Sequence, residues 1–582
     1  MFPSSTRVGA LRWLRRPARA CVLAAVLIGT AAVPLSTASA AAKTATWYVS
    51  AAAAPGGDGT QKAPFSSLAA VEQASHAGDT IMVLPTAASV PPLDGGIALK
   101  PNQHLLGSGP SVVGSSLTNA PRITNSSATQ HNGDAVVLAS GDEVANLEIA
   151  GTYRGAVYGA DVSGVNVHGN DVSAFNTSCT DGLFIAPFTF PTSAPGVGAP
   201  LSTGLKNGFA GIMIDATSAT GNVTIAHNNV HDAACADGID LRLAGTANLK
   251  ASIANNTVTN LGNGGDHQSV LAIGMQTSNS SSLTSNLSYN SESGIGGLES
   301  DSEGFFGYPS DTSNLAITVD HNTFAHGVGG IGPNGRSANG MELVILSGHP
   351  TASMSISNSS FTDTSGDLME ELNWGVSSTM HLSLSNVTAS HSTGAGDTTA
   401  LPFNNGDCLL ESNAGSGTTT SLNVTGTHLS DCAGNGLTVH SNVVNGSGPG
   451  TDLTFDVRSS SITGNRGDNL KVANLTGLTR LTGRTQGTNL SGATGANVAF
   501  DQTGGSTGYA ALDLGGGALG STGNNCIAGA GQADAATTGY NVLAEHNWWG
   551  STTGPGTGRV VAVNGSIQTN PFLTTAPSSC SQ

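Results

Sequence analysis

A short motif recurs along the chain and limits the folds that it can adopt. The motif is a small or polar residue, then a glycine, then apolar residues at alternate positions. Copies occupy residues 155–158, 181–185, 210–214, 237–241, 339–343 and 435–439. The first four copies are 27–29 residues apart, as counted between their glycines. A repeat of this length without a helix cannot bury its apolar face alone, so the copies must stack on one another.

A second strand pattern lies between these copies and ends in asparagine. It is seen in residues 223–230, 251–258 and 317–324, where apolar residues alternate with polar ones. Such alternation predicts strands with one buried face. Asparagine tolerates left-handed turns, and its amides can stack from one coil to the next.

Together the two patterns predict an all-β fold, a single-stranded right-handed parallel β-helix (a solenoid). Its strands would pair above and below at a spacing of about 4.8 Å. A β-sandwich would show alternation without a fixed motif, and a propeller blade needs about 40 residues or more.

The two ends of the predicted solenoid differ from its middle. Residues 47–50 predict a first strand, residues 66–74 predict a short amphipathic helix with a serine N-cap, and residues 78–83 open the repeats. This N-terminal cap, about 44–85, would cover the open edge of the first coil. A closing element is expected at about 540–582, with Trp548 and Trp549 as the plug of the last coil.

The opening and closing segments also resemble a known group of proteins. Residues 48–81, with Gly57-Asp58-Gly59-Thr60 and Gly78-Asp79-Thr80-Ile81, look like the start of bacterial β-helix proteins of the pectate lyase-like (pectin lyase-like) superfamily. Residues 547–555 resemble a closing element of the same group. The resemblance implies the fold over nearly all of the chain. It leaves the reaction open, because the superfamily includes lyases, hydrolases, epimerases, phage tailspikes and non-catalytic surface proteins.

The first 40 residues have the composition of a signal peptide. Five arginines precede an apolar stretch at 21–35, and Ala38-Ser39-Ala40 provides a small-x-small cleavage pattern. We therefore expect residues 1–40 to be removed and a single β-helix domain, 44–582, to be secreted to the extracellular space.

The charge of the chain restricts its partners. Removal of five arginines and no acid changes the net charge from −18 to −23. Nucleic acid and anionic membrane surfaces are poor partners for such a chain. No later stretch is long and apolar enough for membrane insertion, and we expect a monomer.

Six cysteines remain after removal of the signal peptide, an even number suited to an oxidising compartment. Their order favours the pairs Cys179–Cys235, Cys408–Cys432 and Cys526–Cys580, although six cysteines allow 15 connectivities.

One hypothesis for chemistry is hydrolysis of a polysaccharide. Since Ile239 and Leu241 should point inward, Asp240 and Arg242 should face solvent. By the same alternation, Asp215, Glu342 and Glu411 are expected on the outer face.

Local motifs add candidate catalytic carboxylates. Residues 235–240 and 265–267 resemble the two acidic motifs of polygalacturonase-like hydrolases, which would make Asp237 and Asp266 catalytic, with His267 beside them. In the alternative interpretation, Asp237 is a polar turn residue beside a coil glycine, like Asp181 and Asn339.

The second hypothesis is a lyase. It needs a cation, usually calcium, and a base that removes a proton. Glu299, Asp301 and Glu303 could supply oxygen ligands, Phe305 and Tyr308 could stack on a sugar, and Arg242 is a candidate base. In the alternative, the acids are solvated charges, and Arg242 pairs with Asp215 or Asp240.

The sequence therefore predicts a secreted β-helix that binds an extracellular polysaccharide and, in the hypotheses above, cleaves it. The site would comprise Asp237, Asp240, Arg242, Asp266 and His267, with Asp215, Glu342, Phe305 and Tyr308 in contact with the substrate. The alternative is a non-catalytic surface or matrix protein.

Overall fold

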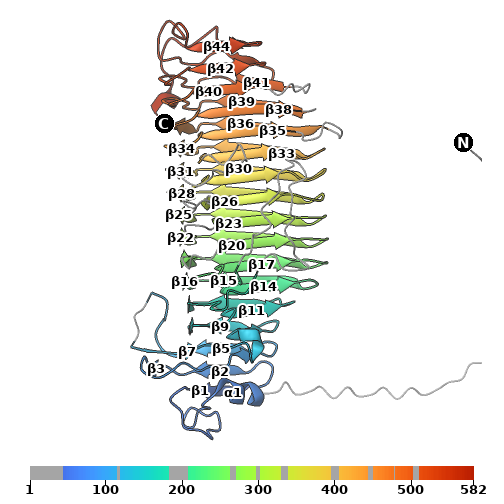
Figure 1. The fold of residues 1–582 in the computed structure, drawn as a ribbon, viewed down its shortest axis with the longest axis vertical. Coiled ribbons are helices and arrows are strands. Elements are labelled where there is room, and N and C mark those ends of the chain that lie inside the picture. Colours follow the sequence, from blue (N-terminus) through green and yellow to red (C-terminus); the bar gives the residue numbers. More distant parts are fainter. Residues whose placement is uncertain are drawn as a thin grey trace, which may run out of the picture. The chain divides into compact units, whose positions relative to one another are not determined.

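The structure is a computed structural model. It describes residues 44–114, 118–182, 208–262, 270–296, 302–328, 338–394, 406–442, 450–476, 479–502 and 510–581. Thr44–Gln582 form one compact unit. Within the described residues, nearly all strands belong to three long sheets, and the strands of each sheet follow one another in chain order (Figure 1).

The first sheet has 17 described strands, all parallel. They are β1 (Thr46–Val49), β2 (Thr80–Val83), β5 (His104–Gly107), β9 (Glu143–Ala145), β12 (Val165–His168), β15 (Thr220–Ala226), β18 (Asn248–Ala254), β21 (Ser282–Ser288), β24 (Asn314–Asp320), β27 (Thr351–Ser357), β30 (Thr379–Ser385), β33 (Thr419–Thr425), β36 (Thr451–Arg458), β39 (Thr479–Gln486), β41 (Ala510–Gly515), β43 (Asn541–Ala544) and β45 (Ser566–Gln568).

The second sheet has 11 described strands, also parallel. They are β7 (Arg122–Ile123), β10 (Glu148–Ala150), β13 (Asp171–Ser173), β16 (Asn229–Ala233), β19 (Thr257–Leu261), β22 (Ser291–Ile295), β25 (Thr323–Ala325), β28 (Ser360–Thr362), β31 (Thr388–Ser390), β34 (His428–Ser430) and β37 (Ser461–Thr463).

The third sheet has 15 described strands in the same parallel arrangement. They are β4 (Ile97–Ala98), β8 (Val136–Leu138), β11 (Val157–Ala160), β14 (Ile212–Ala216), β17 (Ile239–Leu243), β20 (Val270–Thr277), β23 (Ser302–Pro309), β26 (Ala338–Ile345), β29 (Met369–Asn373), β32 (Leu409–Asn413), β35 (Leu437–Asn442), β38 (Leu470–Thr476), β40 (Val498–Asp501), β42 (Ala535–Thr538) and β44 (Val560–Val563).

The remaining elements are few. They are the antiparallel pair β3 (Thr86–Ala87) and β6 (Asn119–Ala120), the helix α1 (Leu68–Ala74) and the 3₁₀ turns η1 (His131–Gly133) and η2 (Ser578–Ser581). Each coil thus contributes one strand to each long sheet over most of the stack, and the predicted parallel β-helix is confirmed. Among the described residues, no helix combines the length and apolar character needed to span a bilayer.

Inward-facing residues of the three sheets form one continuous apolar core. The alternation predicted from the sequence produces this core, because residues at even spacing along a strand face the same side. Phe324 and Phe361, in neighbouring coils, stack with ring centroids 4.6 Å apart. At the closing end, Trp549 is buried in the same core, in keeping with the predicted plug.

The predicted asparagine ladder is present at the turn between the first and second sheets. The amide nitrogens of Asn170, Asn228, Asn256 and Asn290 each donate to the amide oxygen of the next asparagine, at 2.9–3.1 Å, ending on Asn322. The residue just before each of these five asparagines, at 169, 227, 255, 289 and 321, has positive φ.

The N-terminal cap also follows the prediction. The hydroxyl of Ser67 accepts a hydrogen bond from the backbone N–H of Ala70 and caps α1. Leu68 and Val71 of α1 are buried in the core.

One predicted coil is wrong. Residues 181–185 were expected to form a strand between 157 and 212, but Val157 pairs directly with Ile212. Asp181 instead makes an isolated antiparallel bridge with Gly208, and residues 183–185 lie outside the described residues. The motif alone does not distinguish a coil strand from a segment that leaves the stack.

The three predicted disulfide pairs are confirmed. Cys179–Cys235, Cys408–Cys432 and Cys526–Cys580 each have Cα atoms 5.1–5.6 Å apart.

Candidate functional site

The core of the predicted site lies on the outer face of the third sheet. β14 and β17 pair so that Asp215 lies beside Arg242. Ile239 and Leu241 point into the core, so the predicted outward direction of Asp240 and Arg242 is confirmed. Their predicted solvent exposure is wrong, because Asp240 is 0% exposed and Arg242 4% exposed. Alternation gives the direction of a side chain but not what covers it.

Arg242 is held by a bidentate ion pair. Its Nε and Nη2 atoms donate to Oδ1 and Oδ2 of Asp215, both at 2.5 Å. Its Nη1 atom donates to the backbone carbonyl of Gly182. The hydroxyl of Tyr158 donates to Asp215 at 3.1 Å. The alternative in which Arg242 pairs with Asp215 is therefore the arrangement observed, and it satisfies both charges.

A second ion pair lies close to the first. Arg154 donates to the carboxylate of Asp134, with Nη2 and Oδ2 2.5 Å apart. Its guanidinium lies 4.9 Å and 4.4 Å from the ring centroids of Tyr158 and Phe209. Burial first, and then the charge of Asp215, raises the pKa of Tyr158 to about 12, so this phenol remains a hydrogen-bond donor.

The buried position of Asp240 favours its protonated form. Burial raises its pKa to about 8, and the positive charge of Arg242 opposes this shift only in part. The carboxyl group of Asp237 is close enough to interact with it. A protonated acid beside a second carboxyl group is the pairing that general acid–base chemistry requires, but Asp237 is also 0% exposed.

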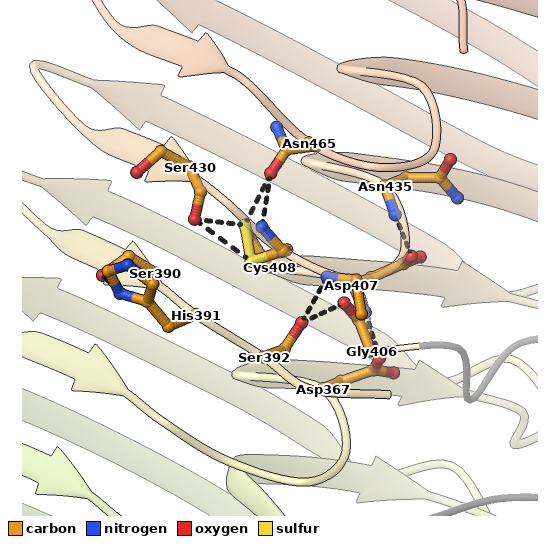
Figure 2. The surroundings of a disulfide bond; sticks show 12 residues. Asp367, Ser390, His391, Ser392, Gly406, Asp407, Cys408, Ser430, Asn435 and Asn465 are labelled. Carbon is orange, nitrogen blue, oxygen red and sulfur yellow. Dashed lines mark hydrogen bonds between the residues drawn. A yellow bond between two sulfur atoms is a disulfide. The ribbon is translucent and has the colours of Figure 1, made fainter. Parts of the chain in front are cut away.

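Asp237 belongs to a ladder of side chains that bind backbone N–H groups of the next coil. Its Oδ1 atom accepts from the N–H of Leu271 at 2.8 Å. The same contact recurs higher in the stack, where Asp367 accepts from Asp407 and Asp407 accepts from Asn435, each at 2.5 Å (Figure 2). The alternative interpretation of Asp237, a polar turn residue beside a coil glycine, accounts for this contact.

Several predicted site residues cannot be placed. Asp266, His267, Glu299 and Asp301 lie outside the described residues. Glu303 is described and 3% exposed, and it pairs in register with Asn339.

The calcium site predicted from the sequence stays a prediction, because Glu299 and Asp301 lie outside the described residues. Among the residues that the structure describes, no group of three histidine, cysteine, aspartate or glutamate side chains could hold a metal ion. The one described ligand of the predicted set, Glu303, is buried.

The predicted sugar-stacking role of Phe305 is wrong, and the predicted exposure of Tyr308 is also wrong. Phe305 points inward and is part of the core. Tyr308 faces outward but is 1% exposed, in an apolar cluster with Phe306 and Trp374 on the outer face of the sheet. Because Phe305 and Phe306 are adjacent and both aromatic, the sequence does not indicate which of them faces the core. Glu342 is half-buried on the same face and lies beside Glu370 in register.

A groove on the outer face of the first sheet was not predicted. It crosses β21, β24, β27, β30 and β33 and encloses about 400 Å³. Its lining comprises Thr284, Ala316, Ile317, Thr318, Ser353, Met354, Ser355, His381, Leu382, Ser383, Ser421 and Asn423. We call this feature the sheet groove. A signal was present in the sequence, because the outward positions of 351–357, 379–385 and 419–425 are serine, threonine, asparagine or histidine.

The sheet groove follows from the register of five strands. Thr284, Ala316, Ser353, His381 and Ser421 stand in one row across the sheet. The Nδ1 atom of His381 lies 2.6 Å from the hydroxyl of Ser421. Among the described residues, no carboxylate, lysine or arginine lines the groove.

Comparison with known proteins finds only distant similarities. No family model matches the chain, and no curated protein matches it. Among solved structures, a rhamnogalacturonan lyase is 14% identical, covers 69% of this chain and 83% of its own, and has a TM-score of 0.34. A pectate lyase is 10% identical to this chain, and the match covers 92% of this chain and 80% of the lyase, with a TM-score of 0.23. An alginate lyase is 8% identical to this chain, and the match covers 91% of this chain and 100% of the lyase, with a TM-score of 0.15. The parallel β-helix is instead established by the strand pairing of the three long sheets.

Proposed function

We propose that this chain is an exported protein that binds an extracellular polysaccharide in the sheet groove. The observation that carries the proposal is an open hollow of about 400 Å³ lined by hydroxyl and amide groups from five successive strands. Export is supported by three disulfides, which persist in oxidising compartments. It is also supported by the basic and apolar residues at the N-terminus.

The lining favours a neutral sugar polymer over a uronate. Hydroxyl groups such as those of Ser353 and Ser383 both donate and accept hydrogen bonds, as sugar hydroxyls do. Ile317, Met354 and Leu382 also belong to the lining, but their side chains point into the core, so the groove offers a sugar mainly polar side chains. A polyanion would meet no cation in the lining and a net charge of −18 over the full chain.

Blocking the sheet groove tests this proposal. Ser355→Trp places a large ring in the groove, and Ser252→Trp places the same ring in the same outward row, outside the lining. We expect pull-down on insoluble neutral polysaccharides, and titration calorimetry with soluble ones, to show at least tenfold weaker binding for Ser355→Trp and unchanged binding for Ser252→Trp. Equal binding by both variants would refute the proposal.

Cleavage of a polysaccharide at the third sheet, away from the sheet groove, is a second candidate function. It is favoured by the raised pKa of Asp240, which keeps a protonated acid beside Asp237 and Arg242. In this hypothesis Asp240 donates a proton to the leaving oxygen, and Asp237 or Asp266 activates water. The buried position of Asp240 requires residues around it to move before a sugar reaches it.

The two candidates are separated by product assays. Reducing ends report hydrolysis, and ultraviolet absorbance of an unsaturated product reports elimination. Product formation that is lost in Asp240→Asn and Arg242→Lys would support cleavage. Binding without either product, with calcium present, would identify a non-catalytic binding protein.

A further inference from the structure

Two glutamates point into the apolar core of the solenoid from neighbouring coils. Glu371 on β29 and Glu411 on β32 are partners in register. Both are 0% exposed. The residues that continue their column below and above are Leu343 and Val439, which belong to the hydrophobic core.

Neither carboxyl group is compensated by its surroundings. All four oxygen atoms of Glu371 and Glu411 are buried and lack a hydrogen-bond partner among the described residues. The inward residues that the other two sheets contribute to these coils are not titratable. They are Phe361, Ala389, Leu429, Met380, Leu382, Leu384, Thr420, Leu422 and Val424. Glu370, on the same strand as Glu371, points to the opposite face and accepts a hydrogen bond from Asn339.

Two charged carboxylates cannot share this space. Neighbouring strands are about 4.8 Å apart, and a pair of negative charges at that separation in an apolar core is strongly unfavourable. The pair must therefore be neutralised by protons or by a divalent cation. A calcium ion takes six to eight oxygen ligands, whereas the column offers hydrocarbon above and below, so protons are favoured.

We propose that Glu371 and Glu411 form a proton-dependent lock in the middle of the solenoid, neutral in the folded coils and destabilising once pH rises far enough to remove a proton. The pKa shifts of the two glutamates agree in direction with this proposal. Burial raises the pKa of Glu411 to about 8, and burial and the neighbouring Glu411 raise the pKa of Glu371 well above its usual value.

The sign of the pH dependence follows from these shifts. A carboxyl group whose pKa is higher in the folded than in the unfolded chain contributes full stability below the unfolded value, near 4.5. That contribution is lost as pH rises toward the folded value, which for Glu411 is about 8. For each group, the folding equilibrium constant falls by up to about tenfold per pH unit in this window.

The test is denaturant unfolding at pH 5, 6, 7 and 8, followed by circular dichroism and by tryptophan fluorescence. Trp374, one residue beyond β29, is a buried local reporter. The denaturant midpoint of the wild type should decrease as pH rises. In the double variant Glu371→Gln and Glu411→Gln, the midpoint should decrease clearly less over the same pH range. Asp452→Asn removes an exposed carboxylate from the outer face of β36 and should keep the wild-type slope.

Other outcomes would overturn the proposal. The same pH slope in the double variant and the wild type would show that the pair does not titrate. A wild-type midpoint at pH 8 that falls on addition of EDTA and returns with calcium would show that a cation neutralises the pair.

If the double variant does not fold, the wild type still provides the test. Infrared spectra at pH 7 should show protonated carboxyl groups, and the band should weaken in Glu411→Gln. A wild-type spectrum without protonated carboxyl groups would refute the lock.

Discussion

Replacement of Asn256 by alanine should destabilise the solenoid strongly, since Asn256 stands in the middle of the buried asparagine ladder. Its Nδ2 atom donates to the carbonyl of Ile225 at 2.9 Å and to Asn290 at 3.1 Å. Its Oδ1 atom accepts from the N–H and from the amide of Asn228, both at 3.0 Å. Asn256 itself is 1% exposed.

The magnitude follows from the groups left without a partner. In the alanine variant, three buried groups lose their hydrogen-bond partner. They are the backbone N–H and the side-chain amide of Asn228 and the backbone carbonyl of Ile225. A buried polar group without a partner costs about 1–3 kcal/mol, so the three together imply a loss of at least about 3 kcal/mol. Entry of a water molecule into the space left by the side chain would keep the loss near this lower value.

The assay is urea unfolding of the disulfide-intact protein at constant pH, followed by circular dichroism. Asn286→Ala is the matched control, because Asn286 is exposed on the outer face of β21, and its loss should change the free energy of unfolding by less than about 0.5 kcal/mol. If Asn256→Ala also changed it by less than about 1 kcal/mol, the ladder would contribute little to stability and the reasoning would be refuted.

Two further predictions concern contacts that join neighbouring coils. Asp215→Ala should lower the free energy of unfolding by about 3 kcal/mol, because it leaves Arg242 buried without its carboxylate partner. The double variant Asp215→Ala with Arg242→Met should recover much of this loss. If urea unfolding showed no recovery, the two residues would not be coupled. Cys408→Ser with Cys432→Ser opens a loop closed across 24 residues and should cost about 3 kcal/mol; a thermal midpoint equal to that of the oxidised wild type would contradict the prediction.

The fold could be predicted from the sequence because it depends on repeated local patterns. The motif at 210–214 and 237–241 and the asparagines at 228 and 256 each specify a coil, and errors in one copy do not disturb the others. The failure at 181–185 is instructive, because the motif is present there although the strand at 157 pairs directly with the strand at 212. Whether a copy of the motif forms a strand of the stack depends on pairing with the next coil, which no local pattern encodes.

The candidate site could be predicted only in part. The direction of Asp240 and Arg242 followed from Ile239 and Leu241, which alternate clearly. Glu411 was placed on the outer face, and this was wrong. Leu409 and Leu410 precede it, so either could have been the inward residue. The structure places Leu409 in the core and Leu410 in the outer apolar cluster, which turns Glu411 inward.

The distribution of polar groups links these findings to the proposed function. On the third sheet, Asp240 and Arg242 are buried and Asp215 is half-buried. Arg242 and Asp215 neutralise each other as an ion pair, and burial raises the pKa of Asp240. On the first sheet, the sheet groove exposes hydroxyl groups, one amide and His381. A partner that approached the third sheet would have to displace existing contacts, whereas a neutral glycan in the sheet groove exchanges only water for its own hydroxyl groups. The sheet groove, whose lining holds no carboxylate, lysine or arginine, is therefore the binding surface that we propose, although the third sheet carries the motifs noted in the sequence.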